Sequence, residues 1–240
     1  MLYINNYFIE NQIIANKLSR PALQPYLKVS YSQLYEDIII ESLILSICKN
    51  HNLDINNFSY IDIGANHSIS TNNTYLFYER YNMDGILVDA NPLLCDELSS
   101  FRSRDHVINA IVSDSNEKES IFYISDKHEI SSLSKDFIIS WNNGMAKVLK
   151  EIIVPNFKIN DILAMSNKKL AILSIDVEGL DKEILSDIDF SKYRPMVIVI
   201  EPSDFFIKDN TNNIIDIMNN NNYTLISITD VNLIFKTNII

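Results

Sequence analysis

The sequence predicts an α/β fold built on an open, mostly parallel β-sheet. From Ser59 onward, short apolar runs rich in β-branched residues alternate with polar, helix-like segments. Apolar runs without strict alternation are typical of strands that are buried on both faces. Near the end of the chain, only Asp230 and Val231 separate two such runs, and this spacing predicts a hairpin. We therefore expect the parallel sheet to finish with an antiparallel pair.

The elements are expected in the following order. Residues 1–57 form an N-terminal helical cap, in which Glu36 to Lys49 is amphipathic, and residues 58–240 form the sheet domain of the same structural unit. The predicted strands are Tyr60–Ile63, Gly85–Val88, Val107–Val112, Leu170–Ile175, Met196–Ile200, Tyr223–Thr229 and Asn232–Thr237. The predicted helices between them are Asn73–Tyr81, Pro92–Ser100, Asp181–Asp187 and Thr211–Asn220. A further strand pair, Ser120–Ser125 and Glu151–Phe157, encloses a region around Trp141 that the sequence leaves open.

Composition narrows the class of protein. Hydrophobic residues make up 47% of the 240 residues, which is enough apolar mass for a core and excludes disorder for the bulk of the chain. The net charge of −11 argues against binding to nucleic acid or to an anionic membrane surface. No apolar run reaches the length of a membrane span, and residues 1–16 do not read as a signal peptide. The only two cysteines, Cys48 and Cys95, are expected to be free thiols in the cytoplasm.

Glycine is scarce, so each glycine marks a position with a special backbone requirement. One of the four, Gly64, directly follows a predicted strand in Tyr60-Ile-Asp-Ile-Gly-Ala-Asn-His. Asp89 follows the next predicted strand. Ligands of open α/β sheets bind at the carboxyl ends of the strands, and an acid at the second strand end can accept both hydroxyls of a ribose. The two positions together predict an adenosine site.

The loop after Gly64 distinguishes between adenosine ligands. A nicotinamide cofactor requires Gly-x-Gly-x-x-Gly, but Ala65, Asn66 and His67 fill the loop here. The sequence also has no Gly-x-x-x-x-Gly-Lys-Ser/Thr segment, which excludes a P-loop nucleotide hydrolase. An adenosine ligand without phosphates, S-adenosylmethionine, fits best.

Five segments in order resemble the FkbM family of S-adenosylmethionine-dependent methyltransferases. They are Ser32–Asp37, Tyr60–His67, Asn73–Arg80, Gly85–Pro92 and Ser174–Leu185, and the resemblance extends to Pro202. It implies a Rossmann-like class I methyltransferase fold, whose seven-stranded sheet has its seventh strand inserted antiparallel. It also implies methylation, mostly of sugar or polyketide hydroxyls. Asp89 and Ala90 depart from the Glu-Pro that the family often has, and the short chain before Ser32 leaves little room for a substrate lid.

The expected cofactor-binding residues lie in or beside these motifs. Asp62 can hold the methionine ammonium, or it can brace the loop after its strand. Ser32 and Gln33 would fold over the cofactor, or they would begin the next helix as its N-cap. Ser113 and Asp114 can meet the adenine amino group or form a surface turn. The full expected set is Ser32, Gln33, Asp62, Gly64, Ala65, Asn66, Asp89, Ala90, Asn91, Ser113 and Asp114.

Methyl transfer to a hydroxyl needs alignment and a group that takes the proton. Asp176 and Glu178 end the fourth predicted strand of the sheet and are the candidate catalytic residues, with His67 as a further candidate base or a brace for its loop. Asp176 and Glu201 end neighbouring strands and form a candidate Mg²⁺ site, a second way to acidify the hydroxyl.

Three functions remain open at this stage. The first is an O-methyltransferase acting on a sugar in a surface glycan, a nucleotide-linked precursor or a related metabolite. The second is a cofactor-binding but catalytically silent partner subunit, and the third is a nicotinamide-dependent sugar-modifying enzyme. The intact Asp176 and Glu178 favour the first. The expected partner is a small molecule or glycan, and the sequence leaves a homo-oligomer open.

Overall fold

The computed structural model describes residues 29–127, 130–177, 179–204 and 208–240. Its centre is a seven-stranded sheet in the order β11-β12-β8-β7-β1-β2-β3. The parallel strands are β1 (Phe58–Ile63), β2 (Gly85–Asp89), β3 (His106–Asn109), β7 (Lys169–Ile175) and β8 (Val197–Ile200). The hairpin of β11 (Tyr223–Ile228) and β12 (Leu233–Thr237) completes the sheet, with β12 antiparallel between β8 and β11. The predicted α/β fold with its inserted antiparallel strand is confirmed.

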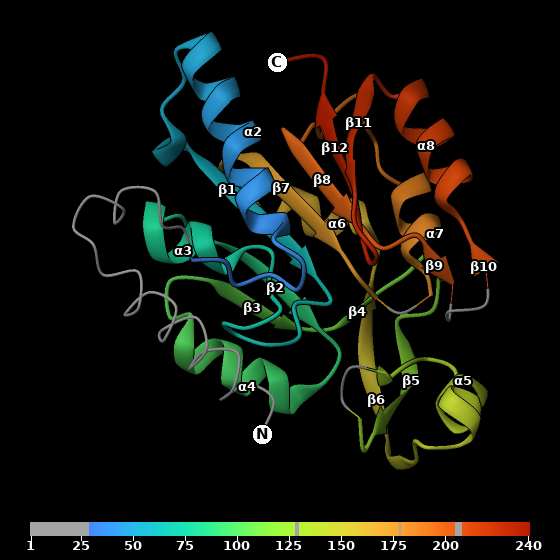
Figure 1. Cartoon of the computed structure of the whole chain (residues 1–240). Coiled ribbons are helices and arrows are strands. Elements are labelled where there is room, and N and C mark those ends of the chain that lie inside the picture. The colour runs from blue at the N-terminus through green and yellow to red at the C-terminus, as the bar shows by residue number, and fades with distance from the viewer. Residues whose placement is uncertain (1–28, 128–129, 178, 205–207) are drawn as a thin grey trace, which may run out of the picture.

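Helices cover both faces of the sheet (Figure 1). One face carries α2 (Glu36–His51), α3 (Tyr75–Tyr81) and α4 (Pro92–Phe101). The other carries α6 (Ile159–Ala164), α7 (Asp181–Ser186) and α8 (Thr211–Asn220). The sequence did not reveal α6, a helix of 6 residues that is too short for a clear hydrophobic period.

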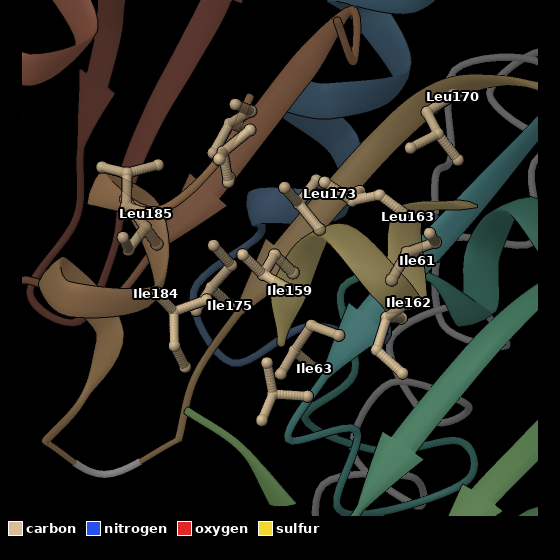
Figure 2. Packing of buried hydrophobic residues seen from close by; sticks show 14 of the residues in the cluster. Ile61, Ile63, Ile159, Ile162, Leu163, Leu170, Leu173, Ile175, Ile184 and Leu185 are labelled. Carbon is tan, nitrogen blue, oxygen red and sulfur yellow. The ribbon is translucent and has the colours of Figure 1, made fainter. Parts of the chain in front are cut away.

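The residues of β1 show why the strands read as continuous apolar runs. Ile61 and Ile63 belong to the cluster beneath α6, α7 and α8, whereas Tyr60 belongs to the cluster beneath α2 and α3. Figure 2 shows Ile61 and Ile63 on the same side as Ile159 and Ile162 of α6. Because both faces of the strand are buried, apolar residues are favoured at every position.

The register of the strands places polar or small residues next to one another along the carboxyl edge of the sheet. Ile63 pairs with Val88 of β2 and Ile175 of β7, and Ile175 pairs with Ile200 of β8. The residues that directly follow these four strand positions therefore lie side by side: Glu201, Asp176, Gly64 and Asp89. The chain order reverses between β7 and β1, which is the switch point where open α/β sheets bind ligands.

A small second sheet lies at this edge (Figure 1). It consists of β4 (Ile111–Val112), β6 (Val148–Phe157) and β5 (Glu119–Ser125), with α5 (Lys135–Ser140) in the connection between β5 and β6. The predicted single strand Val107–Val112 is wrong, because it divides at Ala110. Its first half is β3 of the main sheet and its second half, β4, pairs with β6. An apolar run alone does not show where a chain passes from one sheet to another.

The described part of the predicted helical cap packs against the main sheet. Helix α2 confirms the amphipathic segment, and residues 1–28 of the cap lie outside the described residues. The fully buried Glu36 accepts a hydrogen bond from the Thr229 hydroxyl at 2.8 Å, which joins the start of α2 to the turn of the C-terminal hairpin.

The remaining elements are short. They are η2 (Ile55–Asn57), η4 (Trp141–Asn143), β9 (Ser203–Asp204) and β10 (Lys208–Asp209). Trp141 packs against a small cluster that contains Phe137 and Ile138 of α5, which agrees with a packing role for this single tryptophan. Among the described residues, no helix has the length and apolar character needed to cross a membrane.

Candidate cofactor-binding and active site

A cavity of about 220 Å³ opens between the carboxyl edge of the main sheet and the second sheet. The strand ends supply Gly64, Asp89, Asp176 and their neighbours, and the second sheet supplies the facing wall. The lining residues from the strand ends and the loops after them are Ile63, Gly64, Asn66, Val88, Asp89, Ala90, Asn91, Leu94, Asp176, Val177 and Leu180. The facing wall consists of Ala110, Ile111, Val112, Phe122, Ser131, Ser132, Leu133 and Ser134.

Gly64 allows the ends of β1 and β7 to approach closely. Its φ is +79°, in the left-handed region, and a Cβ at this position would lie 1.7 Å from the carbonyl oxygen of Asp176. The backbone N–H groups of Gly64 and Ala65 both donate to the Val88 carbonyl oxygen, at 2.9 and 3.1 Å. Any side chain at Gly64 would push the two strand ends apart, so the floor of the cavity requires glycine.

The Asp89 carboxylate is held at the cavity by backbone donors. Its Oδ2 accepts from the Asn66 N–H at 2.9 Å, and its Oδ1 accepts from the Asn91 N–H at 2.8 Å. A carboxylate has about four lone-pair sites, so each oxygen can also accept from a ligand. The two backbone bonds fix the orientation in which this acceptor meets a ribose.

Asn66 has an unpartnered acceptor at the same place. Its backbone is left-handed, with φ of 49°. Its Oδ1 is buried and has no hydrogen-bond partner among the described residues, although the residue lines the cavity. Buried side-chain oxygens are rarely left without a donor, and leaving one so costs about 1–3 kcal/mol. A ligand that offers a hydroxyl or ammonium hydrogen here would remove that cost.

The start of helix α4 forms another part of the cavity lining. Asn91 is its N-cap, with Oδ1 accepting from the Leu93 N–H at 3.1 Å, and Pro92 occupies the first helical turn. Leu94, in the first turn of the helix, and Ala90 add apolar surface to the cavity. The predicted segment Asp89-Ala90-Asn91 therefore lines the cavity as a unit.

Asp176 contributes an acid with an unusual protonation equilibrium. The side chain lines the cavity and keeps exposed surface there, but it directly follows the buried strand β7 and is less solvated than a free carboxyl. This loss of solvation raises the pKa of the Asp176 carboxyl to about 6, while a hydrogen bond with Glu201 opposes the rise and the charge of Asp62 adds to it. Asp176 can therefore exchange a proton near neutral pH.

Asp181 organises the loop between Asp176 and α7. Its two carboxylate oxygens accept from the backbone N–H groups of Val177 and Gly179 at 3.0 and 3.1 Å. Burial, together with the charge of Asp176, raises the pKa of Asp181 to about 7, while the backbone hydrogen bonds oppose the rise. Sequence analysis did not single out Asp181; the signal was its position five residues after Asp176, across a loop that contains Gly179.

Glu201 lies beside Asp176, as predicted from the neighbouring strand ends. The two acids share a hydrogen bond, which occupies oxygens that a metal ion would need. Within the described ranges, which leave out Glu178, no group of three or more His, Cys, Asp or Glu side chains could hold a metal ion. The Mg²⁺ prediction for Asp176 and Glu201 thus gains no support.

Three expected cofactor residues lie away from the cavity lining. The Ser32 hydroxyl donates to Asp37 at 2.9 Å near the start of α2, and Gln33 is exposed. Asp62 is buried and accepts from the Thr74 hydroxyl at 2.9 Å, so it braces the loop after β1. Burial raises its pKa. A direct role for these residues in cofactor binding stays a prediction.

Ser113, Asp114 and His67 also lie away from the cavity lining. Ser113 donates to Asn156 of β6 at 2.9 Å, and the Asp114 carbonyl accepts from Lys158, because the chain leaves the main sheet at Ala110 before it reaches them. His67 lies 3.9 Å from Glu97 of α4 and does not line the cavity. Glu178 lies outside the described residues.

The facing wall contains three serines that sequence analysis missed. Each hydroxyl oxygen accepts from a backbone N–H: Ser131 from Ser125 at 3.1 Å, Ser132 from Ser134 at 3.1 Å, and Ser134 from Phe137 at 3.2 Å. Each hydroxyl keeps its own proton for donation. These residues belong to no strand of the main sheet, and the run Ser131-Ser-Leu-Ser resembles an ordinary loop in the sequence.

The residues present fit S-adenosylmethionine. Asp89 and Asn66 offer acceptors for ribose hydroxyls or an ammonium group, while Ala90, Leu94 and Ile111 offer an apolar slot for adenine. Gly64 leaves the floor open to close approach of the ligand. Fold and site together define the class of S-adenosylmethionine-dependent methyltransferases.

Comparison with known proteins agrees with this class. Residues 62–225 match the methyltransferase FkbM domain, and the chain belongs to this family. No curated protein sequence matches the chain. Among solved structures, it is similar to a TehB-like SAM-dependent methyltransferase from Corynebacterium glutamicum, with a TM-score of 0.42 and 8% identity over 95% of this chain and 98% of that one.

Proposed function

We propose that this methyltransferase transfers the methyl group to a hydroxyl of a sugar, in a glycan, a nucleotide-linked sugar or a related metabolite. The observation that carries the proposal is the Asp176 carboxyl, whose exposed side chain lines the cavity and whose pKa is raised to about 6. A base of this strength is partly protonated near neutral pH and suits transient acceptance of a hydroxyl proton.

The cavity-lining residues have distinct roles in this proposal. S-adenosylmethionine supplies an electrophilic methyl group on a sulfonium. Asp89 accepts the ribose hydroxyls, and Asn66 Oδ1 accepts a further hydrogen of the cofactor. The serine wall at 131–134 donates to oxygens of the acceptor. Alignment of the acceptor oxygen with the methyl carbon supplies much of the rate.

Asp176 takes part in the chemical step. As the acceptor oxygen forms its bond to the methyl carbon, the acceptor O–H bond breaks and its proton passes to a carboxylate oxygen of Asp176. Bound S-adenosylmethionine would supply the methyl group and would leave as S-adenosylhomocysteine, with the electron pair of the S–C bond on its sulfur. The hydrogen bond between Asp176 and Glu201 holds the carboxylate in place between turnovers.

Two other functions find less support. A catalytically silent partner subunit needs no proton-accepting acid at the cavity, yet Asp176 lines the cavity and has a raised pKa. A nicotinamide-dependent enzyme needs space for a pyrophosphate after the first strand, where Asn66 instead donates its backbone N–H to Asp89 at 2.9 Å. Location in the cytoplasm is proposed from composition alone, and the sequence leaves assembly into a homo-oligomer open.

Methyl-labelled S-adenosylmethionine tests the proposal. The protein is incubated with a panel of monosaccharides, methyl glycosides, oligosaccharides and nucleotide-linked sugars, and products are identified by mass spectrometry. The proposal expects label in a base-stable methyl ether. Label in an amine or a base-labile ester would overturn O-methylation of a sugar, and cofactor binding without transfer to any member of the panel would favour the silent subunit.

A further inference from the structure

Arg102 is buried at the end of α4, where a charged side chain is unusual. It is the largest of the fully buried side chains in the described chain. Its Nε lies 2.7 Å from Asp105 Oδ2, and both side chains have no exposed surface. A buried arginine is costly unless its hydrogen-bonding groups are matched. The partners of the other guanidinium nitrogens show what this charge organises.

The guanidinium group extends two arms. On one arm, Nη2 donates to the Tyr60 hydroxyl of β1 at 2.8 Å and to the Thr74 hydroxyl, where α3 begins, at 3.1 Å. On the other arm, Nη1 donates to Asn72 Oδ1 at 3.1 Å, in the loop that leads from β1 to α3. The first arm reaches the centre of the sheet, and the second reaches the loop that forms one side of the cavity.

Asn72 connects the two ends of that loop. Its Nδ2 donates to the carbonyl oxygens of Ala65 and His67, each at 3.1 Å. Its Oδ1 accepts from the backbone N–H groups of Thr74 and Tyr75, at 2.9 and 2.8 Å, where α3 begins. One buried side chain therefore fixes the start of the loop against its end, and Arg102 fixes that side chain.

Asn66 lies between the two carbonyl groups that Asn72 holds. Its N–H meets Asp89 Oδ2 at 2.9 Å, its buried Oδ1 has no partner among the described residues, and the residue lines the cavity. Rotation of the backbone at Ala65 or His67 would move both groups. We infer that Arg102 and Asn72 are positioning residues, which set the cofactor acceptors Asn66 and Asp89 from behind the cavity. This inference rests on the proposed function.

The role requires asparagine at position 72. The side chain must donate through Nδ2 and accept through Oδ1 at once, which an amide does and a carboxylate cannot. Asn72→Asp keeps the shape and the acceptor for Arg102, but it turns a charged oxygen towards two carbonyl groups. The new oxygen would also lie near Asp62 Oδ2, which is now 3.4 Å from Nδ2.

The matched control is Tyr60→Phe. The Tyr60 hydroxyl donates to Asp105 at 2.7 Å and accepts from Arg102. Its removal takes away the contact of Arg102 with the sheet, and it leaves in place the bonds of Asn72 and the bond from Arg102 Nη2 to Thr74. A role in stability alone would make the two variants alike in cofactor affinity.

The experiment compares binding with stability in the full chain. S-adenosylhomocysteine is titrated by calorimetry into the wild type, Asn72→Asp and Tyr60→Phe, and urea unfolding is measured for each. We expect Asn72→Asp to weaken binding by about tenfold or more, because two acceptors of the cofactor lose their positions. Tyr60→Phe should lower stability and leave the affinity within roughly threefold of the wild type.

Amide hydrogen exchange at Asn66 gives a second readout that needs no ligand. Asn72→Asp should speed exchange of this N–H, and Tyr60→Phe should not. If Asn72→Asp does not fold, Arg102→Lys takes its place, because an ammonium group cannot reproduce the planar fork that reaches Asn72. Wild-type affinity and slow Asn66 exchange in the loop variant would overturn the inference. A wild type that does not bind S-adenosylhomocysteine would overturn the proposed function, whatever the exchange result.

Discussion

Asp89 and Asp176 show how environment gives two carboxylates different tasks in one cavity. Asp89 is held by two backbone N–H groups, which orient its carboxylate to accept hydrogen bonds from a ligand. Asp176 loses solvation at the end of β7, which raises its pKa to about 6 and suits it to accept a proton. The first residue binds, and the second takes part in the reaction.

Replacement of Asp176 tests its catalytic task. Asp176→Asn keeps the shape of the side chain but removes the proton acceptor, so we expect turnover to fall by about 100-fold or more. Affinity for S-adenosylhomocysteine should stay within a few-fold, because Asp89 and Asn66 are unchanged. Initial rates with labelled cofactor and calorimetry measure the two quantities. Full turnover in the variant would leave Asp176 a structural acid and make His67 the next residue to replace.

The pKa of Asp176 also predicts a pH profile. The reactive form is the deprotonated one, so kcat/KM should rise with pH, bend at about pH 6 and level off above it. Asp176→Asn should lose this inflection. A metal-assisted reaction would differ in a second respect, because a chelator would abolish it and Mg²⁺ would restore it. Rates measured from pH 5 to pH 8, with and without chelator, distinguish the two.

Sequence reasoning found the residues that end strands and missed those that do not. Gly64, Asp89 and Asp176 were predicted together because strand register brings the residues after parallel strands to one edge. Ser113 and Asp114 do not line the cavity because the chain changes sheets at Ala110, which no local pattern marks, and their role in binding stays a prediction. The serine wall was missed because its position depends on how a second sheet packs against the first.

At the scale of elements, the C-terminal hairpin closes the sheet. Strand β12 lies between β8 and β11, and its Leu233, Ile234 and Phe235 have no exposed surface. The spacing of its two strands predicted the hairpin correctly. That β12, the later strand, is the inner one followed from the family resemblance, since local sequence does not specify which strand of a hairpin pairs with the sheet.

Two substitutions in this hairpin test its integration. Phe235→Ala should lower the free energy of unfolding by about 3–5 kcal/mol, because it leaves a cavity in the central core. Ile228, which is 60% exposed on the neighbouring strand, provides the control, and Ile228→Ala should stay within about 0.5 kcal/mol of the wild type. Urea unfolding measures both. Equal, small effects would mean that the hairpin is not part of the folded sheet.

At the scale of the whole molecule, the cavity depends on contacts that are distant in sequence. The two sheets meet in a small apolar cluster of Ile111, Phe122, Ile124 and Val154, against which Ala90 packs. The main sheet supplies the acids and the second sheet supplies the serines. Periodicity and motifs were sufficient to predict the main sheet. They predicted the second sheet only as a strand pair, without its position relative to the main sheet.

The central claim is that this cavity binds an S-adenosyl cofactor through Asp89. Calorimetric titration of the wild type and of Asp89→Ala with S-adenosylhomocysteine, and of the wild type with NAD, tests it most directly. We predict that S-adenosylhomocysteine binds the wild type and NAD does not. Asp89→Ala should lose about 2–3 kcal/mol of binding free energy, roughly 30- to 150-fold in affinity, if both ribose hydroxyls bond to the charged acceptor. Preference for NAD, or unchanged affinity in Asp89→Ala, would contradict the account.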